Sequence, residues 1–120
     1  MKVTQEEMRI YRKSAYERIQ RREAELAERR QRGWEVARQA AAVLKDEFGA
    51  NRVVLFGSLL QPKLFHARSD VDLAVWEVEH YFRAVARLLD LDPEIEINLV
   101  PIEDARPELR TVIEREGVEL

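Results

Sequence analysis

The sequence contains no cysteine among its 120 residues. A disulfide framework and a thiolate metal site are therefore excluded, which is compatible with the reducing cytoplasm. No apolar run approaches the length of a transmembrane helix, and the N-terminus lacks the hydrophobic segment of a signal peptide. We expect a soluble cytoplasmic protein that does not associate with a membrane.

Linkers rich in Gly, Ser or Pro, low-complexity tracts and internal repeats are also missing. The hydrophobic content of 46% excludes a disordered chain, and 120 residues suit one domain with a single modest core. We expect one compact body, residues 49–120, that carries a helical extension, residues 1–48.

Charge is spread unevenly between these two segments. Residues 1–48 carry 12 Lys and Arg against 9 Asp and Glu, net +3, whereas residues 49–120 carry 8 against 14, net −6. Such an acidic body does not suggest direct binding to nucleic acid over a broad surface, although bound divalent ions would change its local sign.

The extension is expected to be a helix, because no proline precedes Pro62 and Thr4 with Glu7 fits a capping box. A continuous helix of this length would run about 65 Å, whereas a compact body of this size is only about 28 Å across. The helix must therefore bend, protrude or rest on something else. Gly33 is the expected bend, since glycine costs about 1 kcal/mol in a helix interior.

The two halves of this helix differ in pattern. After Gly33, an apolar stripe is expected to pack on the core: Trp34, Ala37, Ala41, Leu44 and Phe48. Before it, glutamates alternate with Arg18, Arg21, Arg22, Arg29, Arg30 and Arg32. This alternation favours a solvated, ion-paired helix, while an acidic partner or RNA is the alternative. A short apolar edge suggests that the helix mediates homo-oligomer or hetero-oligomer contacts: Met8, Tyr11, Ala15 and Ile19.

A phosphate cradle is predicted at Gly57 and Ser58. The preceding run, residues 52–56, is β-branched and apolar, so it is expected to be a buried strand that leads into a sharp turn. Glycine lets the backbone approach a polyphosphate, and a serine that opens the next helical turn offers its hydroxyl and amide to phosphate oxygens.

A metal-binding carboxylate pair is predicted at Asp70 and Asp72. Both lie in a strand-like run, and the period of two places them on one face with Val71 and Leu73 on the other. At about 6 to 7 Å apart they repel by roughly 2 to 3 kcal/mol at an effective dielectric of ~20. A divalent ion removes this repulsion, and Mg²⁺ prefers one or two carboxylates together with substrate phosphates.

These motifs resemble the DNA polymerase beta-like nucleotidyltransferases, and within them the minimal nucleotidyltransferases. The resemblance covers residues 51–120 and rests on Phe56-Gly57-Ser58 followed by Ser69-Asp70-Val71-Asp72-Leu73. It implies an α/β (α+β) fold with a palm-like mixed sheet, two Mg²⁺ ions and ATP as the nucleotide substrate. It also implies that Ser69 binds nucleotide together with Gly57 and Ser58.

The third carboxylate of the family falls on Asn98 by the local pattern, and an amide cannot take a proton. Alternation places Glu96 on the same strand face about 7 Å away, so Glu96 is a candidate catalytic replacement beside Asp70 and Asp72. The alternative is that Glu96 is solvated and that Asn98 marks an impaired site.

Two further helices complete the predicted body. Residues 77–90 are expected to pack on the sheet through Val78, Phe82, Val85, Leu88 and Leu89. Pro107 is expected to open a last helix that reaches about Glu116 and stops at Gly117.

The resemblance also implies a partner, a HEPN-domain ribonuclease toxin, with the minimal nucleotidyltransferase as antitoxin transferring AMP from ATP onto the toxin. The absence of a second lobe suits a protein acceptor, because a small acceptor usually needs enclosure. Two hypotheses stay open. The protein is either a Mg²⁺-dependent transferase or a module that neutralises a toxin by binding alone.

Overall fold

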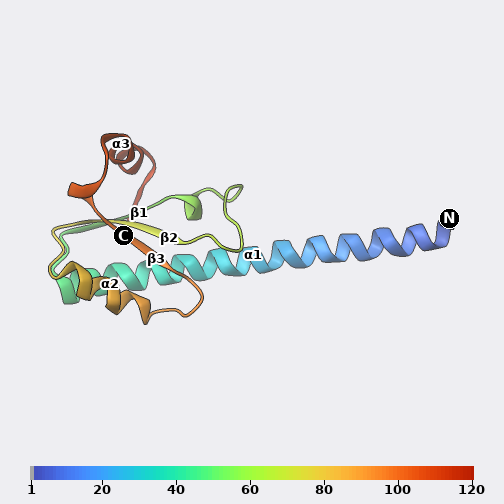
Figure 1. Cartoon of the computed structure of the whole chain (residues 1–120), viewed down its shortest axis with the longest axis horizontal. Helices are drawn as coiled ribbons and strands as arrows, with labels where there is room; N and C mark the ends of the chain where they lie inside the picture. Colours follow the sequence, from blue (N-terminus) through green and yellow to red (C-terminus); the bar gives the residue numbers. More distant parts are fainter. Residues whose placement is uncertain (1) are drawn as a thin grey trace.

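The computed structural model describes residues 2–120, and its longest element is helix α1 (Gln5–Phe48) (Figure 1). Thr4 caps this helix as predicted, because its Oγ1 accepts the backbone N–H of Glu7 at 3.1 Å. The helix ends at Gly49, whose φ of 68° lies in the left-handed region that glycine adopts readily.

The bend predicted at Gly33 is wrong, because α1 runs unbroken through this residue. A Cβ at position 33 would lie 3.0 Å from Cδ1 of Leu59, closer than ordinary van der Waals contact. Glycine at this position therefore allows α1 to approach the body closely and does not interrupt the helix.

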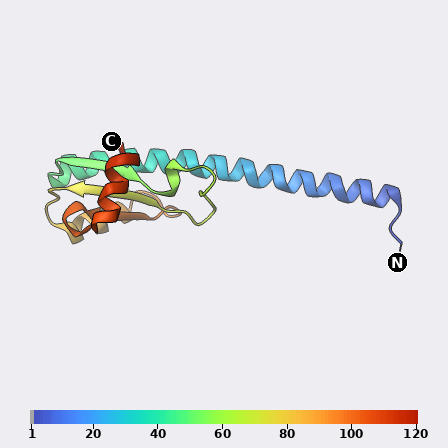
Figure 2. The same cartoon turned by 90° about the horizontal axis from the view of Figure 1, so that it is seen from above.

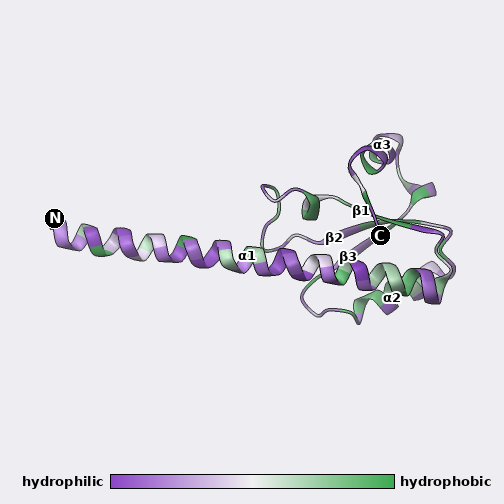
Figure 3. Ribbon diagram, turned by 180° about the vertical axis from the view of Figure 1, so that it is seen from behind, coloured by the Kyte–Doolittle hydropathy of each residue, from purple (hydrophilic) through white to green (hydrophobic). Residues whose placement is uncertain are grey.

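Half of α1 extends past the body as a straight rod (Figures 1 and 2). We call residues 5–24 the overhang; all of them are exposed except Ala15, which is half-buried. The molecule measures 66 × 30 × 21 Å, and its longest dimension matches the roughly 65 Å expected of a helix of 44 residues. The overhang is predominantly hydrophilic, whereas the end of α1 beside the sheet is more hydrophobic (Figure 3).

The body is built on a four-stranded sheet with the order β3-β2-β1-β4. Strand β1 (Arg52–Phe56) runs antiparallel to β2 (Val71–Trp76) and to β4 (Val118–Glu119), while β2 runs parallel to β3 (Ile97–Pro101). The mixed sheet that the family resemblance implied is thus confirmed. Strand β4 was not predicted, because two residues are too few to show a strand period.

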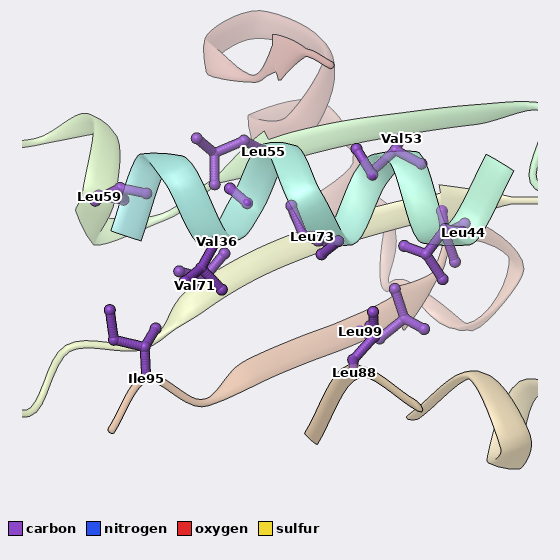
Figure 4. Close-up of a cluster of buried hydrophobic side chains, with 14 of the residues drawn as sticks. Val36, Leu44, Val53, Leu55, Leu59, Val71, Leu73, Leu88, Ile95 and Leu99 are labelled. Atoms are coloured by element: carbon purple, nitrogen blue, oxygen red, sulfur yellow. The ribbon is translucent and has the colours of Figure 1, made fainter. Parts of the chain in front are cut away.

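Each face of the sheet packs on helices. One face meets the second half of α1 and helix α2 (Tyr81–Leu89), with a core that includes Val36, Leu44, Val53, Leu55, Leu73, Leu88 and Leu99 (Figure 4). The buried residues of α1 are Gly33, Val36, Ala37, Ala40, Ala41 and Leu44, so the buried face is centred slightly away from the predicted stripe, and Trp34 and Phe48 lie at its half-buried margin.

The opposite face carries a smaller core under helix α3 (Pro107–Glu116). Its buried members are Val54, Phe56, Ala74 and Ile113. The helix starts with Pro107 in its first turn and stops at Gly117, as predicted. Alternation along β2 places Asp72 on this face, two positions before Ala74, so the predicted chemical face also packs.

Helix α2 (Tyr81–Leu89) starts later than predicted, because Glu77 and His80 have positive φ angles and belong to the connecting loop. The expectation that Phe82 and Leu89 pack on the sheet is wrong, since Phe82 is 86% exposed and Leu89 is 63% exposed. Ala84, two positions after Phe82, is buried. Side chains two positions apart on a helix point about 200° away from each other, so Phe82 faces away from the core. Within residues 2–120, no helix combines the length and apolarity needed to cross a membrane.

Candidate active site

Strand register brings four of the candidate residues together. The parallel pairing of β2 with β3 sets Asp72 beside Asn98, and the antiparallel pairing of β2 with β1 sets Asp72 beside Phe56. Gly57 follows Phe56 directly, and Asp70 comes just before the start of β2. The end of β1 and the starts of β2 and β3 therefore meet at one corner of the sheet, which we call the carboxylate corner: Gly57, Asp70, Asp72 and Asn98.

Asn98 links the two aspartates. Its Nδ2 donates to Oδ2 of Asp70 at 3.3 Å and to Oδ1 of Asp72 at 3.1 Å. Both carboxylates thus lie within reach of a single atom, as chelation of one cation would also require. The sequence motif placed the family's third position at Asn98, and the structure places Asn98 between the two aspartates.

The electrostatics of the corner disfavour negative charge on Asp72. Burial raises the pKa of Asp72, the hydrogen bond from Asn98 lowers it, and the neighbouring charge of Asp70 raises it again. The net result is a pKa above the ordinary value of an aspartate. The corner is therefore short of positive charge, which a divalent cation would supply.

Gly57 is held in a conformation that only glycine adopts readily, with φ of 87° and ψ of −157°. A Cβ at this position would overlap Oδ2 of Asp72. The missing side chain therefore leaves room for the Asp72 carboxylate, a role that the sequence did not reveal.

Ser58 and Ser69 occupy different settings. Ser58 is half-buried and opens a short 3-10 helix, Ser58–Leu60, directly after Gly57. Ser69 is buried, and its Oγ accepts the backbone N–H of His66 at 2.9 Å, which closes the turn before Asp70. Nucleotide binding by Gly57, Ser58 and Ser69 stays a prediction.

Glu96 lies outside the carboxylate corner. It is exposed and precedes β3, and its backbone carbonyl accepts the N–H of Val71 at 2.9 Å. Among residues 2–120, no group of three or more Asp, Glu, His or Cys side chains is arranged to hold a metal ion, so Glu96 does not complete a three-carboxylate site with Asp70 and Asp72. Glu96 and Asp70 do line the same cavity of about 470 Å³.

Three arginines of α1 make contacts that sequence reasoning did not foresee. The interpretation as a solvated, ion-paired helix is wrong for Arg29 and Arg30, which are half-buried and donate to backbone carbonyls of the body, whereas Arg32 is exposed and forms an ion pair with Asp92. The helical period, continued backwards from Leu44 through Gly33, falls on positions 29 and 30. This continuation of the buried face is the signal that could have identified them.

The fold and the corner define a class of protein. A Gly-Ser turn directly after β1 and an Asp-x-Asp motif at the start of β2, on a mixed sheet, match the pattern on which the resemblance to nucleotidyltransferases rests. Residues 38–120 match the family described as Polymerase beta, Nucleotidyltransferase. The chain belongs to this family.

Solved structures share the fold. A chain of a toxin–antitoxin crystal structure with AMP-PNP is 21% identical, with a TM-score of 0.57 over 69% of this chain and 70% of that chain. A chain of the toxin–antitoxin MntA-HepT is 17% identical, with a TM-score of 0.52 over 72% of this chain and 69% of that chain. A mutant of that complex gives 19% identity and a TM-score of 0.56 over 69% and 70%. No protein with a curated description matches the sequence.

Proposed function

We propose that this protein is a Mg²⁺-dependent nucleotidyltransferase that acts as an antitoxin and transfers AMP from ATP to a hydroxyl of a HEPN-domain toxin. The observation that carries the proposal is the carboxylate corner, where Asp70 and Asp72 lie within reach of one atom beside a glycine turn. The solved structures that share the fold support the partner and the nucleotide, since they are toxin–antitoxin structures and one was determined with AMP-PNP.

The donor set of the corner fits Mg²⁺. This ion is usually held by one or two carboxylates together with substrate phosphates, and Asp70 and Asp72 offer two carboxylates that both reach Asn98 Nδ2. When bound, the metal would neutralise charge that develops on the phosphate oxygens during transfer. One of the solved toxin–antitoxin mutants carries two aspartate-to-glutamate changes two residues apart, which is the spacing of Asp70 and Asp72.

The chain's own residues are assigned these roles. Asp70 and Asp72 bind the metal, and Gly57, Ser58 and Ser69 bind the nucleotide. In the transfer step, the acceptor hydroxyl oxygen forms a bond to the α-phosphorus of ATP, and the bond to the bridging oxygen breaks so that pyrophosphate leaves. We assign the hydroxyl proton to Glu96, because it lines the same cavity as Asp70.

A second function is favoured by Asn98. Its amide already occupies both aspartates as a hydrogen-bond donor, and it cannot accept a proton. A protein with this corner and no transferase activity would still present the antitoxin fold to a toxin and would neutralise it by contact alone.

The test is an incubation of the protein with Mg²⁺, ATP labelled at the α-phosphate and the HEPN protein encoded beside it, if its genome contains one. Transfer predicts that label enters the HEPN protein and that its ribonuclease activity falls. Replacing Asp70 and Asp72 by asparagine should abolish both effects. Loss of ribonuclease activity without label, in wild type and variant alike, would establish neutralisation by contact and refute transfer.

A further inference from the structure

One turn of α1 is bonded to both loops that carry the site. Arg29 Nη2 donates to the carbonyl of Ser69 and to the carbonyl of Glu94, each at 3.2 Å. Arg30 Nε donates to the carbonyl of Leu59, also at 3.2 Å. The three acceptors lie 29 to 65 residues away along the chain, so these bonds connect segments that the sequence separates widely.

The bonded carbonyls are next to the functional residues. The Ser69 carbonyl belongs to the peptide group that continues into Asp70, and Leu59 directly follows Ser58. The Glu94 carbonyl lies in the loop before β3. Two residues later in this loop, the carbonyl of Glu96 accepts the backbone N–H of Val71, the first residue of β2. The two arginines therefore hold the backbone next to Ser58 in one loop and next to Asp70 in the other.

The surroundings of Arg29 indicate that these bonds hold it in place. The side chains of Arg29 and Arg30 are half-buried, and Arg29 Nε is buried without a hydrogen-bond partner within residues 2–120. Removing a charged nitrogen from water without a partner disfavours this position. The bonds from Nη2 to two carbonyls oppose that cost, since hydrogen bonds from a charged donor are stronger than neutral ones.

We propose that Arg29 and Arg30 are positioning residues for nucleotidyl transfer, which set the distance between the Gly57–Ser58 turn and the Asp70–Asp72 pair. The inference rests on the proposed function for its chemical meaning. It assigns to α1 a role in the site beyond covering the sheet, although neither arginine is assigned contact with the reacting atoms.

The test uses the full chain with Arg29→Met and Arg30→Met combined, because methionine keeps an unbranched stem and removes the donors. Two readouts are measured: amide hydrogen exchange over residues 59–72 and 94–97, and affinity for Mn²⁺ with ATP by calorimetry. We expect exchange in both segments to rise at least tenfold and the affinity to fall at least tenfold. Arg29→Lys, which retains a charged donor, should recover part of both.

Two controls separate positioning from general stability. Arg22→Met removes an arginine from the exposed overhang of the same helix and should change neither readout. Ala42→Gly weakens α1 at an exposed site and should lower the melting temperature without changing the affinity.

The outcomes distinguish this inference from the proposed function. Wild-type exchange and affinity in the double variant would overturn the inference, and so would an equal loss of affinity in Ala42→Gly. If wild type itself does not bind Mn²⁺ with ATP, the proposed function fails. The exchange data alone then decide the inference: unchanged protection of residues 59–72 overturns it, and lost protection supports the backbone role of the two arginines.

Discussion

The carboxylate corner and the turn at Asp92 shift the pKa of a partly or fully buried aspartate in opposite directions. At the turn, burial alone would raise the pKa of Asp92, but the N–H of Glu94, the guanidinium of Arg32 and the N–H of Ile95 lower it below its ordinary value. At the corner, the pKa of Asp72 is raised by burial, with only the Asn98 amide to oppose it.

The difference teaches where each region obtains its positive charge. The Asp92 turn receives a cation from the chain itself, through the ion pair with Arg32, and so its charge is satisfied by folding. The corner contains two carboxylates whose shared partner is a neutral amide. Folding leaves this charge deficit, and a cation from solution would remove it.

The largest expected effect comes from removing the two negative charges of the carboxylate corner. Replacing Asp70 and Asp72 by asparagine should weaken Mn²⁺-dependent ATP binding about 100-fold or more, because the metal loses both charged ligands. Without cation, the free energy of unfolding should stay the same or rise, since the repulsion is gone. Calorimetry and urea denaturation measure the two effects.

The matched control for this change is Asp92→Asn, which should leave cation-dependent binding intact. Equal affinity in wild type and the double variant would refute the assignment of the metal ligands.

The second effect concerns the space beside Asp72. Gly57→Ala should lower the free energy of unfolding by about 1 to 3 kcal/mol, because alanine resists this backbone conformation. It should also weaken Mn²⁺ binding, since the new Cβ displaces the Asp72 carboxylate.

Gly33→Ala is the control. It should change stability by less than about 1 kcal/mol, because the gain in helix propensity offsets the shift of the flexible Leu59. Equal effects of the two substitutions would contradict this account.

The third prediction concerns a substitution that adds a negative charge to the carboxylate corner. Asn98→Asp should lower cation-free stability by about 1 kcal/mol, because a donor is replaced by a third negative charge. The same change should tighten Mn²⁺ binding roughly tenfold, as one added ligand charge is worth about 1.4 kcal/mol or more. Titration followed by electron paramagnetic resonance measures the affinity, and Asn51→Asp at an exposed position is the control. Weaker Mn²⁺ binding by Asn98→Asp would show that the amide is itself the better partner.

The smallest expected effect is a pH dependence at the turn. Because the folded-state pKa of Asp92 is lowered, its charged form stabilises the fold above the unfolded pKa of about 3.9, and this contribution is lost as the pH falls through the folded pKa. Asp92→Asn keeps the acceptor for both backbone N–H groups and removes the charge. Urea denaturation should therefore give a higher free energy of unfolding for wild type than for the variant at pH 7. This difference in free energy should disappear below pH ~4. A constant gap would mean that charge is not what stabilises the turn.

Local pattern was enough to predict much of this molecule. The mixed sheet was implied by the family resemblance, whereas the caps at Thr4 and Gly117 and the strand over residues 52–56 follow from residues close in sequence. Such features depend on backbone geometry that repeats within an element, so a short stretch of sequence carries them.

The remainder depends on contacts between distant segments. A bend was predicted at Gly33 because glycine has a low helix propensity. The contact between Gly33 and Leu59, which explains the glycine, cannot be read from the sequence. Arg29 and Arg30 looked solvated because their acceptors are backbone carbonyls, which have no signature in the sequence. Phe82 fits a helical apolar pattern, yet which side of a nine-residue helix is buried is decided by its neighbours in space.

The overhang also governs how the protein behaves as a particle in solution. The radius of gyration is 19.4 Å, whereas a compact chain of this length would have about 13.6 Å. By the same scaling, a globular protein with the observed radius would contain about 300 residues. A monomer of this chain will therefore elute from a sizing column earlier than a compact globular protein of the same mass. Its stoichiometry, alone or with a partner, must be read from light scattering or sedimentation, which report mass without assuming a sphere.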